Sequence, residues 1–328
     1  NSNTILIMEL FYTIIIFMVV LFIYVHVFFH ISTSDDLEVY EIKMPSKDKL
    51  EELCDLKQPV KLSYTNTVLN THFVKKELIQ NYGAFDVSVR NAAYTDNDSL
   101  KHIILTLQTT IELLQKDDES SYFTERNQSF IEETTLIKQF KMADSILRPY
   151  MVSSCHYDVM FGSKDTTTPL RREVSYRNYY YVTEGSVTIK FAPDKYTKYL
   201  YSETDNELFE FRARTNPWKP QESYKNDFNK VQFMEVTINK NEMVFIPAYW
   251  WYSIRFNSIE STVVSFKYFT YMNTVSVSPK LMLHYLQRLN TKSLVEKTAN
   301  NQPNTTQHNN QDTIIESNES SNSQPDSS

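Results

Sequence analysis

The sequence predicts a mainly β fold with a helical N-terminal part. Between residue 161 and about residue 272, apolar and polar residues alternate in short segments, most clearly in Tyr179–Val182 and Val187–Phe191. Both segments read as strands, and Glu184-Gly185 predicts the turn between them. Before residue 161, apolar residues recur mainly at helical spacing, which predicts the helical part.

Leu10–Phe29 is a segment of roughly twenty residues without Asp, Glu, Lys or Arg, long enough to span the hydrocarbon core of a bilayer. We expect one transmembrane helix here, after a stub of residues 1–9. The segment lacks the basic n-region, the shorter apolar run and the small cleavage-site residues of a signal peptide. A buried core helix is the alternative, but a segment that is apolar on all faces favours the membrane. Lys43, Lys47 and Lys49 follow the segment and no Lys or Arg precedes it, which predicts a single-pass protein with a cytosolic main domain.

The rest of the chain divides by composition. Residues 30–48 are polar and predict a stalk, and residues 49–297 hold the expected folded domain. Beyond Lys297 the chain is rich in Asn, Gln, Ser and Thr and has no Lys or Arg. Because such a composition cannot bury enough apolar surface to fold, residues 298–328 are predicted to be a disordered tail.

Hydrophobic spacing and the positions of Gly and Pro predict further elements within the domain. Ahead of the mainly β region, we expect two strands, at Leu56–Leu62 and Phe85–Val89. We also expect three helices, at Phe73–Tyr82 (ending at Gly83), Ser99–Lys116 and Asn127–Phe140. Later in the chain, Asp205–Lys230 predicts a loop or insert, and Ser278–Glu296 predicts a C-terminal helix.

Composition also narrows the class of function. The formal charge of −7 speaks against a nucleic-acid-binding protein, which needs a basic excess. The three glycines leave no glycine-rich phosphate-binding loop. Cys54 and Cys155 form no metal-binding or disulfide pattern and are expected to be free thiols. The surplus of Asn, Ile, Lys and Tyr suggests an AT-rich genome, as in some large DNA viruses.

Two segments carry a resemblance to a known family. Their matching residues are Gly162-Ser163, Thr168-Pro169-Leu170 and Gly185 in the first segment, and Ile246-Pro247 and Trp250-Trp251 in the second. These residues resemble the core motifs of the jumonji-type (JmjC) and cupin-like 2-oxoglutarate oxygenases. The resemblance covers most of residues 59–272, and it implies a double-stranded β-helix, which is a jelly-roll fold of the cupin type.

The resemblance also locates the family's iron ligands, which are two imidazoles and a carboxylate on one face of the ion. Those three positions here hold Arg171, Glu173 and Tyr252. A guanidinium has no acceptor and a neutral phenol is a poor iron ligand, so we expect no metal. Glu173 could still ligate a cation. We expect Arg171 to form an ion pair with Glu173 that fills the space the metal leaves.

The family's 2-oxoglutarate pocket is altered as well. Thr168 is retained, and Asn178 lies one residue out of step with the family's asparagine. The lysine that binds the far carboxylate falls on Val187. Lys190 is close by, but strand alternation turns it to the other face unless the register differs. Thr168, Asn178 and Lys190 are thus the candidate residues of an eroded pocket, and the family's late asparagine falls on Lys267.

Two further patterns have both a functional and a plain interpretation. His156-Tyr157-Asp158 spells the H-x-D of a metal site, but it lies before the ligand strand, and no histidine follows at the expected distance. A structural role for His156 is favoured. Trp250-Trp251 could form a ligand cage, but large aromatic side chains in such strands are favoured as core.

Function is less constrained than fold, because one fold supports many functions. The first hypothesis is a catalytically inactive, oxygenase-derived binding or scaffold module at a membrane, with a possible protein partner and no expected cofactor. The second is an oxygenase with an altered metal site that uses Fe(II) and 2-oxoglutarate on a protein or other macromolecule. A purely structural role, for instance in a virion, is the third.

Overall fold

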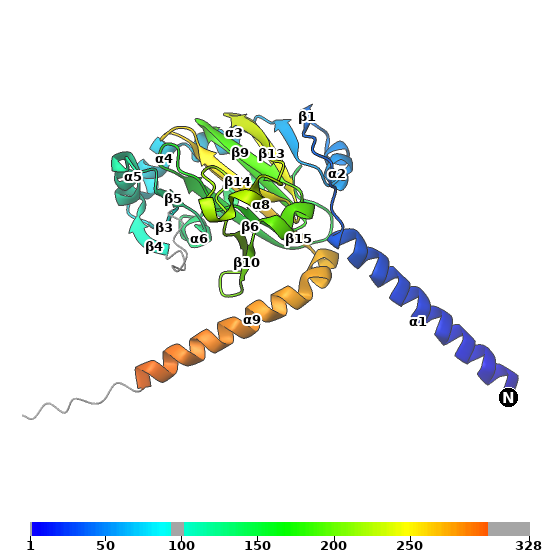
Figure 1. Cartoon of the computed structure of the whole chain (residues 1–328). Coiled ribbons are helices and arrows are strands. Elements are labelled where there is room, and N and C mark those ends of the chain that lie inside the picture. Colours follow the sequence, from blue (N-terminus) through cyan, green and yellow to red (C-terminus); the bar gives the residue numbers. More distant parts are fainter. Residues whose placement is uncertain (1, 93–101, 301–328) are drawn as a thin grey trace, which may run out of the picture. The chain divides into compact units, whose positions relative to one another are not determined.

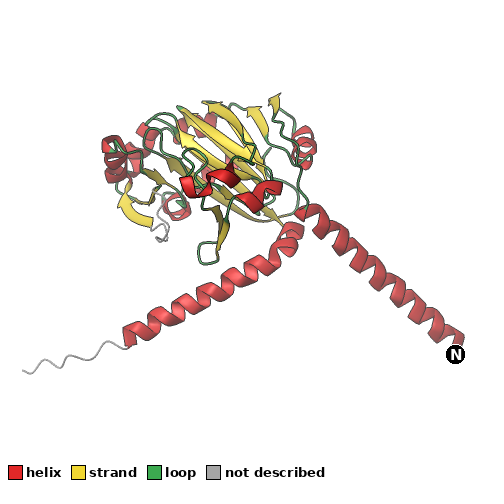
Figure 2. Ribbon diagram, in the orientation of Figure 1, coloured by secondary structure: helices red, strands yellow, loops and turns green. Residues whose placement is uncertain are grey.

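The computed structural model describes residues 2–92 and 102–300, and its centre is a pair of six-stranded sheets (Figure 1, Figure 2). The first sheet has the order β1 (Tyr40–Lys43), β2 (Val60–Ser63), β13 (Glu242–Pro247), β8 (Arg177–Glu184), β15 (Thr262–Thr270), β6 (Val152–Phe161). The second has the order β10 (Ser202–Asp205), β11 (Glu210–Ala213), β7 (Arg171–Arg172), β14 (Trp251–Phe256), β9 (Ser186–Ala192), β12 (Met234–Asn239).

All neighbouring strands in these sheets are antiparallel except β1 and β2, which are parallel. Consecutive strands β8 and β9 lie in different sheets, so the two sheets together make the predicted jelly roll. The turn between β8 and β9 is the predicted Glu184-Gly185 turn, where Gly185 has a φ of +66° that a side chain would strain.

Each face of the first sheet contributes to a different core, because successive residues of a strand point to opposite faces. In β8, Tyr180 and Val182 face the second sheet and pack with Ile189 and Ile254. The residues between them, such as Tyr179, face outward into a second core. This second core is closed by α2 (Lys47–Asp55), α3 (Thr67–His72), α4 (Lys75–Tyr82), α5 (Leu107–Lys116), α6 (Gln128–Glu133) and α7 (Ile137–Ala143).

A third, three-stranded sheet has the order β4 (His102–Thr106), β3 (Asp86–Asn91), β5 (Tyr122–Thr124). The predicted helix Ser99–Lys116 is wrong over β4: these residues pair with β3, and Thr106 starts α5 as an N-cap by accepting a hydrogen bond from the Thr109 N–H. Residues 99–101 lie outside the described part of the chain. The predicted helix Asn127–Phe140 is divided into α6 and α7, because Thr135 between them has a φ of +58°.

The predicted insert Asp205–Lys230 is only partly a loop. It includes β11, the 3-10 helix η2 (Glu222–Tyr224) and α8 (Lys225–Phe228), while the 3-10 helix η1 (Asp194–Tyr199) precedes β10. Cys54 and Cys155 are free, as predicted.

The N-terminal helix α1 spans Ser2–Ile31, and its Ile7–Ile31 part is long and apolar enough to cross a membrane. The stub predicted for residues 1–9 is part of this helix from Ser2 onward. The stalk predicted for residues 30–48 is wrong in its central part, since residues 40–43 form β1 and pair with β2 through main-chain hydrogen bonds.

Helix α9 spans Tyr271–Asn300 and so includes the predicted helix Ser278–Glu296. Residues up to Gln287 belong to one compact unit with the sheets, and a second unit begins at Arg288. The predicted tail lies outside the described residues from position 301 onward.

Candidate functional site

The fold brings the three expected ligand positions together between the two main sheets. Arg171 of β7 is the cross-strand partner of Tyr252 in β14, and Glu173 follows β7 directly. The Tyr252 hydroxyl donates a hydrogen bond to Oε1 of Glu173 at 2.9 Å. It also lies 2.6 Å from the hydroxyl of Tyr180 in β8 on the opposite sheet.

Lys267 of β15 completes this group. Its Nζ lies 2.6 Å from Oε1 of Glu173, the same oxygen that accepts from Tyr252. Lys267 reaches this point because it is the cross-strand neighbour of Asn178 in β8 and therefore lies on the face of the first sheet that also carries Tyr180. The side chains of Glu173 and Lys267 are 21% and 26% exposed, so water screens the pair only in part. We call Lys267, Glu173, Tyr252 and Tyr180 the central network.

In the central network, electrostatic interactions keep Lys267 and Glu173 charged, and burial keeps the two tyrosines protonated. Burial raises the pKa of Glu173, but the cations of Lys267 and Arg171 outweigh burial, and the net pKa lies below the usual value. Burial lowers the pKa of Lys267, and the carboxylate of Glu173 outweighs it, so the net pKa is raised. Burial is also the main cause that raises the pKa of Tyr252, which stays a neutral phenol.

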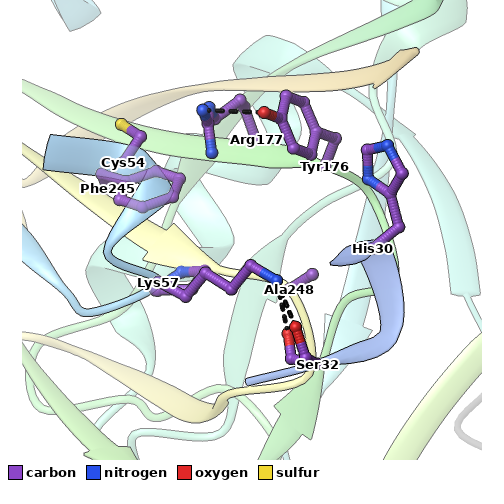
Figure 3. Close-up of a pocket in the computed structure, with 9 residues that line it drawn as sticks. His30, Ser32, Cys54, Lys57, Tyr176, Arg177, Phe245 and Ala248 are labelled. Atoms are coloured by element: carbon purple, nitrogen blue, oxygen red, sulfur yellow. Dashed lines mark hydrogen bonds between the residues drawn. The ribbon is translucent and has the colours of Figure 1, made fainter. Parts of the chain in front are cut away.

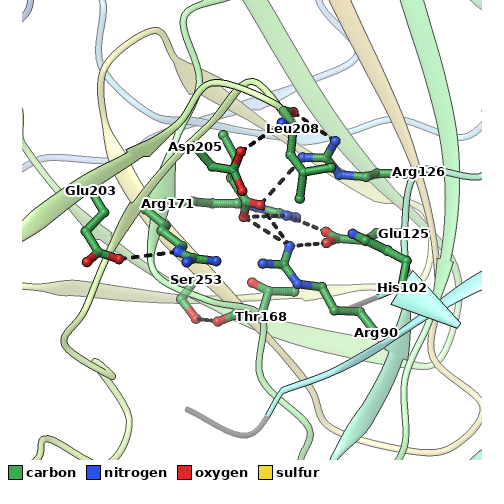
Figure 4. Close-up of polar contacts among 12 residues, drawn as sticks. Arg90, His102, Glu125, Arg126, Thr168, Arg171, Glu203, Asp205, Leu208 and Ser253 are labelled. Atoms are coloured by element: carbon green, nitrogen blue, oxygen red, sulfur yellow. Dashed lines mark hydrogen bonds and ion pairs between the residues drawn. The ribbon is translucent and has the colours of Figure 1, made fainter. Parts of the chain in front are cut away.

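Arg171 does not form the ion pair with Glu173 that the sequence led us to expect. Its Nη1 instead pairs with Oε2 of Glu125, which follows β5 of the three-stranded sheet (Figure 4). Glu125 also pairs with the fully buried Arg90 of β3, and Arg90 contacts Oε1 of Glu210 in β11 at 3.0 Å. Burial raises the pKa of Glu125, and the guanidinium groups of Arg171 and Arg90 more than reverse this and hold it well below the usual value. We call Arg90, Glu125, Arg171 and Glu210 the arginine cluster.

The donors at these positions do not fit the iron site of the oxygenases. Arg171 offers only N–H groups, and Lys267 is a protonated ammonium that already uses the carboxylate of Glu173. Within residues 2–92 and 102–300, no three side chains of the His, Cys, Asp or Glu type are placed to hold a metal ion.

The three candidate cosubstrate residues have other partners. Oγ1 of Thr168 accepts a hydrogen bond from the Ile254 N–H at 2.9 Å. Nδ2 of Asn178 donates to the carbonyls of Ser175 and Ile246, both at 3.2 Å. These contacts tie segments of the barrel together.

Lys190 lies on the outer face of the second sheet, as strand alternation indicates, and the pocket role that we considered for it is wrong. Its Nζ donates to the carbonyl of Pro217 at 3.2 Å and lies 4.5 Å from the ring centre of Trp218. Val187, the position of the family's lysine, is fully buried in the core between the sheets.

The two remaining sequence patterns have structural roles. Nδ1 of His156 lies 3.0 Å from Oε1 of Gln128, and Asp158 accepts main-chain N–H groups of Arg126 and Asn127 at 2.7 and 2.9 Å. His156 is exposed and is the cross-strand neighbour of Lys267, and among the described residues it belongs to no group of three side chains that could hold a metal ion. The indoles of Trp250 and Trp251 are fully buried and donate hydrogen bonds to Lys57 and Thr197, so the core interpretation holds.

Sequence reasoning missed the partners of the charged residues. No sequence pattern singles out Arg90, Glu125 or Glu210, although Glu125 follows the strand-like residues 122–124 and a buried arginine at position 171 requires a carboxylate. The resemblance places the family's late asparagine at Lys267, but it does not predict the contact of Lys267 with Glu173.

Comparison with known proteins agrees with this architecture. The family model described as "Cupin-like domain" matches residues 44–276. The chain therefore belongs to the cupin-like domain family. No match was found among curated proteins.

Proposed function

We propose that this chain is a membrane-anchored cupin-like protein whose barrel does not carry out iron- and 2-oxoglutarate-dependent oxygenation and acts as a binding or scaffold module. The observation that carries the proposal is the 2.6 Å contact between Lys267 and Glu173. In the family that the sequence resembles, the position of Glu173 supplies the carboxylate ligand. Here that carboxylate is already neutralised by a cation of the protein itself.

A dication at this position would meet several unfavourable terms. It would lie next to the ammonium of Lys267 and near the guanidinium of Arg171, and like charges at a few ångströms repel strongly in a partly desolvated site. It would also have to take Glu173 away from two hydrogen-bond donors, Lys267 and Tyr252. Two of the three expected ligands are replaced, since the guanidinium of Arg171 has no lone pair to donate and the neutral phenol of Tyr252 is a poor iron ligand.

The anchor is proposed from α1. Ile7–Ile31 is apolar and long enough to cross the hydrocarbon core, and its side chains from Ile7 to Val25 are exposed. The lysines that follow this helix favour a cytosolic domain. A membrane-bound module of this kind would present its surface to a protein partner on one side of the bilayer.

The alternative, an oxygenase with an altered metal site, would need further ligands for a cation at Glu173. It would also need a cation for the far carboxylate of 2-oxoglutarate. Lys190 does not reach the interior, and Lys267 reaches it but is paired with Glu173.

The test is turnover by the full-length chain purified in detergent. The chain is incubated with Fe(II), 2-oxoglutarate and oxygen, and succinate is quantified against a sample without protein. We expect no succinate above that control. Succinate release over several turnovers would overturn the proposal in favour of the oxygenase.

A further inference from the structure

The last turn of α1 is attached to the domain through Lys57, which precedes β2. Nζ of Lys57 donates to the carbonyl of Ser32 at 2.9 Å and to its hydroxyl at 2.6 Å, and it also contacts the carbonyl of Phe29. The carbonyls at the C-terminal end of a helix lack partners within the helix and carry partial negative charge. Lys57 therefore satisfies the end of α1 with a cation from the folded domain.

A second contact lies beside the first. The ring of His30 packs edge to face on Tyr176, with 5.0 Å between the ring centres. The hydroxyl of Tyr176 donates to Asp55 at 3.0 Å, and Arg177 pairs with Asp55 at 2.5 Å and with Glu51 at 3.0 Å. The end of α1 thus packs on a set of side chains that are themselves fixed by α2 and β8.

The residues after α1 are attached as well. Nε2 of Gln58 donates to Oδ2 of Asp36 at 2.9 Å, and Nζ of Lys195 donates to the carbonyl of Asp35 at 2.9 Å. The N–H of Tyr40 donates to the carbonyl of Pro59 at 3.1 Å, where β1 begins. The chain from His30 to Tyr40 is therefore held at several points, by residues 57–59, by Tyr176 and by Lys195.

A cavity of about 20 Å³ lies inside this junction (Figure 3). His30, Lys57 and Arg177 line it on the polar side, and Phe245 and Pro247 line it on the apolar side. Nδ1 of His30 and Nε of Arg177 are buried without a protein partner. A cavity of this size with two such polar atoms has room for about one water molecule, which would complete the contact.

We propose that this junction fixes the domain directly on the bilayer, so that the face around Leu56 and Tyr176 lies at the lipid interface. The proposal rests on the membrane anchor proposed above. Leu56 is 48% exposed and adjoins Lys57, which touches the last turn of the apolar helix, so a bilayer that ends at this turn would have Leu56 at its boundary. Lys57 and Arg177 are balanced by Glu51 and Asp55, so the face requires no anionic lipid.

The experiment uses the full-length chain in phosphatidylcholine nanodiscs, with Cys155→Ser as background and a nitroxide label at Leu56→Cys. The control label is Ile104→Cys, which is 60% exposed on β4, at the opposite side of the domain from α2 (Figure 1). Power saturation with oxygen and a nickel chelate compares their depths. We expect the label at 56 to show the collision profile of the lipid interface and the label at 104 that of water. Water-like profiles at both positions would overturn the proposal.

A second variant tests the junction itself. Lys57→Met should shift the collision profile of the label at 56 toward that of water. An aspartate-directed protease should also cut this variant at Asp35 or Asp36 about tenfold faster, because losing one charge-assisted hydrogen bond changes the opening equilibrium by about that factor. Lys61→Met is the matched control, because Lys61 lies in β2 and pairs with Glu242 at 3.1 Å. No difference between the two variants would contradict the role of Lys57.

Flotation with liposomes separates the two levels of the proposal. A chain that does not float would contradict the anchor itself. A chain that floats and yet gives a water-like label at position 56 would contradict the docking alone.

Discussion

Lys267 and Glu173, 94 residues apart, meet between the two sheets with 2.6 Å between Nζ and Oε1. Lys267 comes from β15 of one sheet and Glu173 follows β7 of the other, so the contact depends on the complete fold. It places a protein cation at the carboxylate that the oxygenase family uses for iron. The account of this barrel as a module without iron chemistry depends on this pair.

The pair should be strongly coupled in stability. Glu173→Gln leaves the largely buried ammonium of Lys267 without its carboxylate, and Lys267→Met leaves the carboxylate of Glu173 without its cation. Each substitution should therefore lower the unfolding free energy by about 3 kcal/mol. The double variant should cost much less than the sum, as urea denaturation would measure. Lys190→Met is the control, since its contact with Glu235 at 3.7 Å lies on the outer face, and it should cost less than about 1 kcal/mol. Additive losses would mean that the two residues do not form a pair in solution.

Acid should weaken the same interaction. The pKa of Glu173 in the folded protein lies below its ordinary value of 4.5, because Lys267 and Arg171 outweigh burial. Its stabilisation is therefore complete above that value and disappears as pH falls through the lower folded pKa. The difference in unfolding free energy between wild type and Glu173→Gln should be constant from pH 7 to about 5 and shrink below pH 4.5. A difference that does not change down to pH 3 would contradict this assignment.

The arginine cluster should be equally sensitive to loss of its central carboxylate. Glu125→Gln removes the charge shared by Arg90 and Arg171, and we expect a loss of about 4 kcal/mol in urea denaturation. Glu203→Gln is a suitable control, because Glu203 pairs with Arg214 at the surface and should contribute less than about 1 kcal/mol. Similar small losses for both variants would show that the cluster does not stabilise the barrel.

The membrane anchor has a separate biochemical test. The full-length chain should stay in the pellet after alkaline carbonate extraction of membranes, because a spanning helix is not released by high pH. A chain that begins at Asp36 should be soluble. Recovery of the full-length chain in the carbonate supernatant would rule out a spanning α1.

The motif residues made the sheets predictable to a large extent. Gly185 identified the turn between β8 and β9, and alternation around it assigned both strands. The segment around Ile103 was less predictable, since its apolar spacing fits a helix as well as an edge strand. Thr106 was the available signal, because a threonine before Leu107 is a typical helix N-cap.

The site was predictable in its positions but not in its contacts. The family motif located Arg171, Glu173 and Tyr252, and the fold does bring them together. Which cation neutralises Glu173 depends on the relative register of two sheets, which a single sequence does not specify. Glu125 could not be assigned to Arg171 for the same reason, since it comes from the separate three-stranded sheet.

Removal of Lys267 should decide whether this position can still hold a metal. Arg171→His, Glu173→Asp and Tyr252→His together restore the family's ligand types, but Lys267 would still occupy the carboxylate. We expect weak Mn(II) binding only when Lys267→Ala is added, with Lys190→Ala added instead as the matched control. Binding that is equal in both fourfold variants would contradict a blocking role for Lys267.

The most direct measurement is a titration of the wild-type chain with Mn(II), in which electron paramagnetic resonance reports the free ion. The account predicts that free Mn(II) rises in proportion to the amount added, with no saturable site, both with and without 2-oxoglutarate. One Mn(II) bound per chain, lost in the Glu173→Gln variant, would contradict the claim that Lys267 and Glu173 replace the metal centre.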